Sequence, residues 1–346
     1  MKLKKISAIM LATILLLTAA VLPVSAAKGD PVPEHFTKGV GPETEGYSID
    51  YHYFSPVKEN DSTKYPLVIW LHGMGDGRTE GYQVTASDIN YWTTEDYQKR
   101  FEESGGAFIL APRSIEEKEL YWTDELVYPL RAAIDDFIDK NEKNLDLQRI
   151  YIGGYSMGGK MTLKMAVAYP EMFAAIFPIC PAWVPDTDAT QYLRDMPVWM
   201  TSGAMDPLVS YYTFVLPTWD NILSQSSMPE NCRLSTLAMT VFPNGLPNSS
   251  GHHSWYSVNG DMFSSKNKDY PMMKTQNGLG ENIELTYPEG MIFWLSGFRS
   301  NFDGANATDG GNSQALKSND AVRGIASLKL FMQNFFRYIS YMLFGK

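Results

Sequence analysis

A serine with the surroundings of a nucleophile stands at position 156. It lies in the pentapeptide Gly-Tyr-Ser-Met-Gly at 154–158, which has the G-x-S-x-G pattern. An apolar run at 150–152 precedes it, and apolar residues at helical spacing follow at 161–168. A serine between a strand and a helix sits on a tight turn that exposes its hydroxyl at the carboxyl end of the strand. Ser156 is therefore our candidate nucleophile; the alternative is a glycine-rich turn with an incidental serine.

A serine hydroxyl needs a base to take its proton and a carboxylate to orient that base. Where this turn is catalytic, the acid comes next along the chain and the histidine last. Of the five histidines, only His252 and His253 follow the serine. We prefer His252, because Gly251 precedes it and Trp255 follows three residues later, and His253 remains the alternative.

Asp206 is the best-placed acid. It follows an apolar run at 197–201 and a turn at 202–205, so it lies beyond the end of an expected strand. Its alternative role is that of a helix N-cap. Four other acids lie near helical or loop segments instead: Asp186, Asp188, Asp195 and Asp220.

A second glycine-rich segment lies earlier in the chain. The apolar run at 67–71 ends in His-Gly-Met-Gly-Asp-Gly at 72–77. Such a loop can turn its amides toward a developing oxyanion, and we propose the N–H groups of Met74 and Met157 for this task. A plain glycine loop is the alternative; phosphate binding is disfavoured, because neither G-x-G-x-x-G nor a Walker lysine is present.

The elements that must position these residues alternate between strands and helices. We expect buried or half-buried strands at 47–53, 65–71, 107–112, 147–153, 174–180, 197–201 and 234–242. We expect helices after the serine, at 126–141 and at 287–299, surface chain at 31–44, and a long loop at 79–97. This alternation predicts an α/β fold with a mostly parallel sheet and helices on both faces.

Composition and end segments suggest an exported protein. Among 346 residues the formal charge is −10, which argues against nucleic acid as a partner. Residues 1–26 have the lysines, apolar run and small-residue cleavage site of a signal peptide, with an uncleaved anchor as the alternative. A catalytic domain at 27–300 and a flexible linker at 301–320 would follow.

The tail at 321–346 has apolar residues at spacings of three and four and carries only basic charges after Asp320. It indicates an amphipathic helix that binds an anionic membrane surface, a partner, or the domain itself. Cys180 and Cys232 are the only cysteines and either form a disulfide or are free thiols. C-x-x-C and H-E-x-x-H motifs are absent, so we predict no metal site and no cofactor.

Together these motifs resemble the α/β-hydrolase superfamily, and within it the secreted esterases and predicted peptidases that include feruloyl and acetyl-xylan esterase-like enzymes. The resemblance covers roughly 65–299 and rests on the segments 66–77, 112–122, 149–180, 197–209, 251–255 and 288–295. In that family the histidine stands three residues before the tryptophan, which supports His252. The segments 77–97 and 259–286 look like insertions, and the tail is not part of the pattern.

The resemblance implies a secreted or cell-surface serine esterase, with a small-molecule or polysaccharide ester as substrate. Export and the aromatic residues favour a feruloyl or acetyl ester on carbohydrate. Trp122 and Trp255, with Tyr82 and Trp92, are candidates for stacking on a sugar or aryl ring. The alternatives are a prolyl-oligopeptidase-like peptidase and a non-catalytic surface-binding protein on a hydrolase scaffold.

Overall fold

The computed structural model describes residues 31–87, 89–115, 121–238, 240–241, 247–248, 251–259, 273–285 and 290–304. The expected signal peptide at 1–26 and tail helix at 321–346 lie outside these residues, as does the linker beyond position 304. The described residues lie almost entirely within the expected catalytic domain at 27–300. Within that part, no helix is long and apolar enough to cross a membrane.

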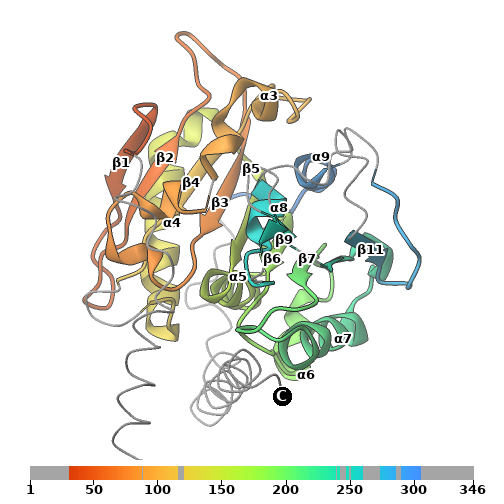
Figure 1. The fold of residues 1–346 in the computed structure, drawn as a ribbon. Helices are drawn as coiled ribbons and strands as arrows, with labels where there is room; N and C mark the ends of the chain where they lie inside the picture. Colours follow the sequence, from red (N-terminus) through yellow and green to blue (C-terminus); the bar gives the residue numbers. More distant parts are fainter. Residues whose placement is uncertain are drawn as a thin grey trace, which may run out of the picture.

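A single nine-stranded sheet organises the described chain, in the order β1-β2-β4-β3-β5-β6-β7-β8-β11. Figure 1 shows it running from β1 at one side of the molecule to β11 at the other. The strands are β1 (Phe36–Val40), β2 (Asp50–Phe54), β3 (Tyr65–Leu71), β4 (Phe108–Pro112), β5 (Leu145–Tyr155), β6 (Ala175–Ile179), β7 (Trp199–Gly203), β8 (Arg233–Leu237) and β11 (Met273–Asn277). From β4 to β8 all neighbours are parallel, whereas β1, β2 and β11 pair antiparallel at the edges. The predicted mostly parallel α/β sheet is confirmed.

Helices cover both faces because the central strands are apolar on both sides. In β3, alternate side chains enter two cores: Leu67, Ile69 and Leu71 enter one, and Val68 and Trp70 the other. The first core is closed by α4 (Val127–Asn141), α5 (Met157–Ala168), α6 (Thr187–Thr190) and α7 (Leu216–Gln225). The second is closed by α2 (Tyr82–Thr85), the turn at Ile89–Thr93, α8 (Trp255–Asn259) and α9 (Met291–Ser296). A short α3 (Glu95–Gln98), a π-helix (Tyr211–Val215) and several three-residue 3-10 helices lie between these elements.

The structure corrects several expectations about elements. The strand expected at 234–242 is two strands, β8 and β9 (Thr240–Val241), and β9 pairs with β10 (Pro247–Asn248) in a separate ribbon. The sheet also gains β11 from the expected insertion at 259–286, and β1 from the segment expected on the surface. These edge strands have little apolar alternation, because partner strands rather than side chains define them.

The segment expected to be a long overhanging loop at 79–97 packs against the sheet instead. Trp92 is only 1% exposed and stacks on Phe177 with ring centroids 5.7 Å apart. It therefore closes the second core and is not available to stack on a sugar. The two cysteines are free and buried, so they do not form the disulfide that the sequence left open.

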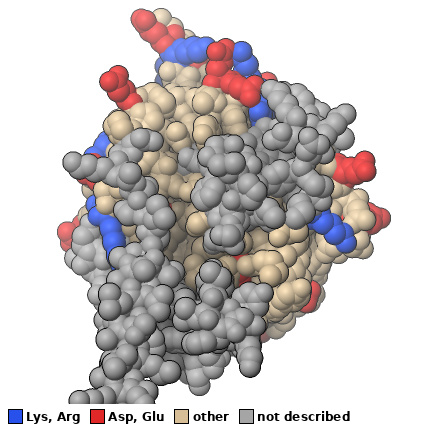
Figure 2. All heavy atoms as spheres, in the orientation of Figure 1, with Lys and Arg blue, Asp and Glu red and all other residues tan. Residues whose placement is uncertain are grey.

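Charge is distributed without a strong bias on the face drawn in Figure 2. Acidic and basic side chains of the described residues lie interspersed, mainly near the outline of this view. A polyanion would need a continuous basic surface. The described residues on this face do not form one.

Candidate active site

Ser156 lies on a strained turn between β5 and α5. Its backbone has φ 57° and ψ −115°, a conformation that is unfavourable for any residue except glycine. The Ser156 amide donates to the Ile179 carbonyl at 2.9 Å, and the Ser156 carbonyl accepts from the Ala182 amide at 3.1 Å. Two hydrogen bonds to the chain around the end of β6 thus hold the serine in this conformation.

Glycines let this turn lie directly against the end of β3. A β-carbon at Gly158 would lie 2.1 Å from the Leu71 carbonyl oxygen, and one at Gly154 would lie 2.3 Å from the same atom. A β-carbon at Gly73 would lie 2.4 Å from the Tyr155 ring. The serine turn and the 72–77 loop are therefore in backbone contact, as an oxyanion site shared between them requires.

The two expected oxyanion donors lie in these two segments. Met157 is the first residue of α5, so its amide has no acceptor within the helix and lies at the positive end of the helix dipole. Met74 lies in the 72–77 loop between Gly73 and Gly75, and Gly75 has φ 101°. Assignment of these amides as the oxyanion hole remains a prediction.

His72 holds the 72–77 loop, named the oxyanion loop below after its predicted role, from inside. Its ring is fully buried, with Nδ1 2.7 Å from the Gly73 carbonyl and Nε2 accepting from the Ser114 amide at 3.0 Å. Burial lowers the pKa of His72 to about 4, so the ring is neutral with its proton on Nδ1. The Trp122 indole N–H donates to the His72 carbonyl at 2.9 Å.

A side-chain hydrogen bond also joins the oxyanion loop to the serine turn. The Tyr155 hydroxyl donates to the carboxylate of Asp76. The Tyr155 ring stacks on Trp255, with ring centroids 4.0 Å apart and planes inclined by 25°. The residue before the serine therefore contacts both the oxyanion loop and the segment that carries the histidines.

His252 and Asp206 form a buried pair. The His252 Nδ1 and the Asp206 Oδ2 are 2.8 Å apart, and both residues are less than one tenth exposed. The other carboxylate oxygen, Oδ1, accepts from the amides of Leu208 and Val209 at 2.8 Å each. These two amides fix the orientation of the carboxylate toward the imidazole.

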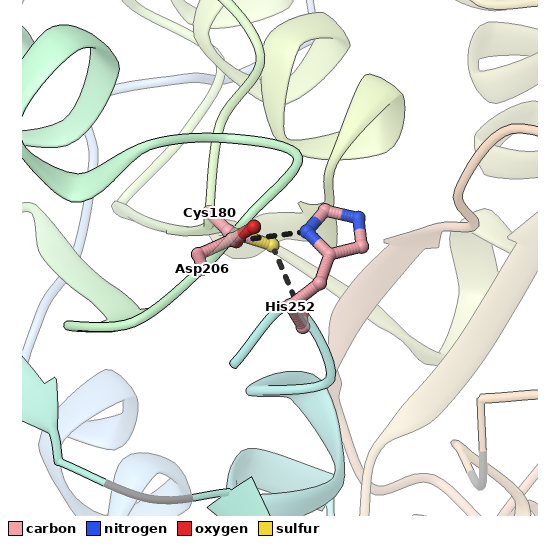
Figure 3. Close-up of side chains that lie close together, drawn as sticks. All are labelled: Cys180, Asp206 and His252. Carbon is pink, nitrogen blue, oxygen red and sulfur yellow. Dashed lines mark hydrogen bonds and ion pairs between the residues drawn. The ribbon is translucent and has the colours of Figure 1, made fainter. Parts of the chain in front are cut away.

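Charge decides the proton affinity of this histidine. Burial by itself disfavours the imidazolium, but the negative charge of Asp206, together with the neighbouring Cys180 sulfur, outweighs it and raises the pKa of His252 well above its ordinary value. Figure 3 shows Nδ1 directed at the carboxylate and the second ring nitrogen directed away from it. That second nitrogen is the one that a general base of this kind uses.

Several contacts bring this pair to the serine end of the sheet. A β-carbon at Gly203, the last residue of β7, would lie 2.1 Å from the Gly251 carbonyl oxygen. Trp255 links the His252 ring, with centroids 5.6 Å apart, to Tyr155 beside the serine. Ser156 follows β5 and Asp206 follows β7, two places along the same sheet, and His252 is bonded to Asp206. Their order along the chain is the one that a hydrolytic triad requires.

The structure gives different surroundings to His252 and His253, the two histidines between which the sequence could not choose a base. His253 lies against Trp255 and Tyr256, with centroid distances of 4.8 and 5.8 Å. Burial, together with the neighbouring His252, lowers the pKa of His253 to about 4. The hydrogen bond to Asp206 favours His252 as the base.

Two expected substrate contacts are not supported. Trp122 has no exposed surface, and its indole N–H donates to the His72 carbonyl, so its ring cannot stack on a ligand. Trp255 is 6% exposed and packs face to face on Tyr155, which leaves little of its ring for a substrate. Both tryptophans support the loops of the site instead. Sequence patterns reveal that an aromatic residue is near a motif but not which way its ring points.

Exposed apolar side chains lie on the loops beside the site instead. Met74 on the oxyanion loop is 48% exposed, Met205 next to Asp206 is 74% exposed, and Tyr212 on the following π-helix is 72% exposed. Exposed apolar residues around a site commonly mark a binding surface. The sequence analysis missed Met205 and Tyr212, although Met205 directly precedes the expected acid.

Comparisons with known proteins point to esterases. A family model described as "Putative esterase" matches residues 48–210, a segment that contains Ser156 and Asp206 but ends before His252. The chain is 24% identical over 176 residues to the bifunctional acetylxylan esterase/xylanase XynS20E of Neocallimastix patriciarum, covering 48% of this chain and 23% of that protein.

Among solved structures, the chain is similar to one titled "Crystal Structure of a Thermostable Esterase". The TM-score is 0.53 at 28% sequence identity, and the match covers 66% of this chain and 60% of that one. The chain thus spans less than two thirds of the length of either relative. Fold, serine turn and family model agree: residues 48–210 match the esterase family model, and the sheet has the α/β-hydrolase fold of its esterase structural neighbour.

Proposed function

We propose that this protein is a serine esterase that hydrolyses carboxylic esters through an acyl-enzyme. One observation carries the proposal: a serine on a strained strand-to-helix turn lies at the same end of the parallel strands as a buried, hydrogen-bonded aspartate–histidine pair. A serine held at φ 57° without a catalytic task would be a costly feature to retain. The match of residues 48–210 to an esterase family model supports the ester as the bond that is cleaved.

In the proposed reaction, Ser156 Oγ attacks the ester carbonyl while its proton passes to Nε2 of His252. The amides of Met74 and Met157 stabilise the oxyanion of the tetrahedral intermediate. The intermediate collapses, the C–O bond to the alcohol breaks, and the imidazolium returns the proton to the leaving alkoxide. Water, deprotonated by the same imidazole, then attacks the acyl-enzyme, which releases the acid and restores the serine.

Asp206 stays ionised throughout and orients the imidazole. The raised pKa of His252 fits this task, because the carboxylate that raises it also stabilises the imidazolium formed during each proton transfer. The oxyanion loop needs no rearrangement of its own, since His72 and Tyr155 already hold it. No step requires a cofactor.

A carbohydrate-linked ester is our proposal for the substrate. Support comes from the acetylxylan esterase in the name of a distant relative, and from the signal peptide that the sequence predicts at 1–26. The exposed side chains of Met74, Met205 and Tyr212 offer apolar surface that suits an aryl or acetyl group better than a charged one. We also propose that the protein is secreted, and that the tail at 321–346 gives it a contact with a membrane surface or a partner.

Fluorophosphonate labelling of the purified protein tests the nucleophile. We expect labelling of the wild type, none of Ser156→Ala, and little of His252→Ala. His253→Ala is the matched control and should label like the wild type, because His252 carries the bond to Asp206. Wild-type protein that does not label would refute an activated serine, and equal loss in both histidine variants would refute the assignment of the base.

A substrate panel then tests the bond. Aryl acetates, acetylated xylan, a feruloyl ester and peptide amides should be compared at equal enzyme concentration. We expect hydrolysis of the esters, with preference for the carbohydrate-linked ones, and no cleavage of the amides. Amide cleavage would favour a peptidase, and cleavage of simple aryl esters alone would remove the carbohydrate part of the proposal.

A further inference from the structure

A third buried side chain reaches the acid–base pair. Cys180, which follows β6, places its sulfur 3.7 Å from the His252 carbonyl oxygen, and the thiol is fully buried. The sulfur, a carboxylate oxygen of Asp206 and a ring nitrogen of His252 all lie within 4.8 Å of one another. In Figure 3 the three side chains converge on one point from three separate segments of the chain.

The backbone holds each of the three groups in place. Cys180 has a φ of 35°, and its amide donates to the Thr201 carbonyl at 2.8 Å. The Asp206 carboxylate is held by two backbone amides, and the His252 turn packs on the end of β7 through Gly251. The convergence is therefore built by three backbone segments: the loops after β6 and β7 and the turn that carries His252.

A thiolate, an imidazole nitrogen and a carboxylate are ligands that Zn²⁺ and similar divalent metals bind tightly. At ordinary zinc distances of about 2.0 Å to nitrogen or oxygen and about 2.3 Å to sulfur, tetrahedral ligand atoms lie about 3.3 to 3.6 Å apart. The present separation of 2.8 Å between Nδ1 and Oδ2 would have to open by about half an ångström, while all three ligand atoms already lie within 4.8 Å of one another.

We propose that Cys180, Asp206 and His252 form an inhibitory binding site for Zn²⁺ and related thiophilic divalent cations. The metal binds Nδ1 of His252 in place of the proton that faces Asp206; that proton moves to Nε2 of the neutral imidazole, and the proton of the Cys180 thiol leaves to solvent. A protonated Nε2 cannot accept the proton of the serine, so the base is lost although the metal does not contact the serine. The effect on catalysis rests on the proposed function, whereas binding of the metal does not.

The second cysteine provides a matched control. Cys232 is also free and fully buried, but it precedes β8 at the opposite end of the strands, where its sulfur lies near the Ser226 hydroxyl and the Met196 carbonyl. Among the residues that the structure describes, Cys180, Asp206 and His252 are the only group with metal-ligand geometry. Loss of Cys180, and not of Cys232, should therefore abolish binding.

Binding is measured first, with Co²⁺ as a spectroscopic probe on the chelator-treated full chain. We expect a thiolate-to-cobalt charge-transfer band in the wild type and in Cys232→Ser, displaced by added Zn²⁺. The band should be absent from Cys180→Ala and from Cys180→Ser, which keeps the side-chain volume in case the alanine variant does not fold. A wild type without the band, or a band that persists in either Cys180 variant, would overturn the proposal.

Inhibition is measured next, after preincubation with Zn²⁺, as the rate relative to the same variant in chelator. Wild type and Cys232→Ser should be inhibited and should recover when chelator is added. The Cys180 variants should need at least about 10- to 100-fold more zinc, the range found when even an outer partner of a metal ligand is lost. Equal inhibition of the wild type and the Cys180 variants would refute the site.

The two arms keep this proposal separate from the proposed function. A chain that shows the Cys180-dependent cobalt band but hydrolyses no ester retains the metal site and loses the esterase. A chain that hydrolyses esters without binding cobalt retains the esterase and loses the metal site.

Discussion

Replacing Asp206 by asparagine tests the proposed triad with the smallest possible change of shape. In the structure, Oδ1 of Asp206 accepts two hydrogen bonds from the amides of Leu208 and Val209, and Oδ2 faces Nδ1 of His252. An asparagine must keep its oxygen toward the two amides, because an NH₂ group there would meet two further donors. Its NH₂ group therefore faces His252.

This orientation reverses the tautomer of the base. With an N–H donor opposite it, Nδ1 of His252 becomes an acceptor, and the imidazole proton moves to Nε2. A protonated Nε2 cannot take the proton of Ser156. The same substitution in the triad of chymotrypsin-like proteases lowers kcat by about 10⁴-fold, equivalent to about 5 kcal/mol of barrier, and we expect a loss of that order here.

The pH dependence supplies a second readout. The base must be neutral, so kcat/KM of the wild type should rise with pH through the pKa of His252, which Asp206 and Cys180 hold above its ordinary value against the effect of burial. Without the carboxylate charge, burial dominates and lowers that pKa. The rising limb of the much weaker variant should therefore lie at lower pH than that of the wild type.

Hydrolysis of an aryl acetate across a pH series measures both effects, with thermal unfolding to confirm that each variant is folded. Asp220→Asn is the matched control, because Asp220 is an exposed residue of α7, and it should match the wild type. An Asp206→Asn variant within about tenfold of wild-type kcat at its optimum would refute the tautomer argument. A rising limb that does not move would show that Asp206 does not set the proton affinity of His252.

Three further predictions concern the loops around the site. Gly158→Ala should lower the free energy of unfolding, measured by denaturant titration, by about 1 to 3 kcal/mol or more, because the added β-carbon would lie 2.1 Å from the Leu71 carbonyl oxygen at the end of β3. Gly297→Ala is the control and should cost much less, because the nearest atom to its β-carbon would lie 3.3 Å away. His72 is neutral in the folded protein with a pKa of about 4, against 6.5 in the unfolded chain, so its contribution to stability is complete above pH 6.5 and is lost as pH falls toward 4. His72→Asn lacks this titration, so the difference in free energy of unfolding between wild type and variant should shift by about 3 kcal/mol between pH 6.5 and pH 4. Tyr155→Phe removes the hydrogen bond to Asp76 and should lower kcat for ester hydrolysis by about tenfold or more while KM changes little, because a hydrogen bond to a charged group contributes about 1.5 to 3 kcal/mol. An unchanged kcat would show that the oxyanion loop is held in place without this hydrogen bond.

Periodicity identified the core of the fold well. The parallel strands from β3 to β7 and the helices α4 and α5 lie close to where their apolar patterns predict them, because buried strands and amphipathic helices have distinctive spacing. The edge strands β1 and β11 were missed, and β8 and β9 were taken for one strand. Their formation depends on pairing with a neighbour, which leaves only a weak trace in the sequence.

The chemical identity of the candidate site is a matter of sequence. Residue type and order along the chain singled out Ser156, Asp206 and the two histidines, because a nucleophile turn and the requirement for a later acid and base exclude nearly every other residue. The choice between His252 and His253 was only a preference at that level. Neighbouring residues in a chain differ in direction, and direction is a property of the turn that carries them.

Tertiary structure decided what each side chain faces. It placed His252 against Asp206, turned Trp122 into a support for the oxyanion loop, and brought Cys180 to the same point from a third segment. The chain positions 180, 206 and 252 have no spacing that could reveal this cluster. Parallel strands bring their carboxyl ends together whatever the length of chain between them, so only the folded sheet determines which distant residues meet.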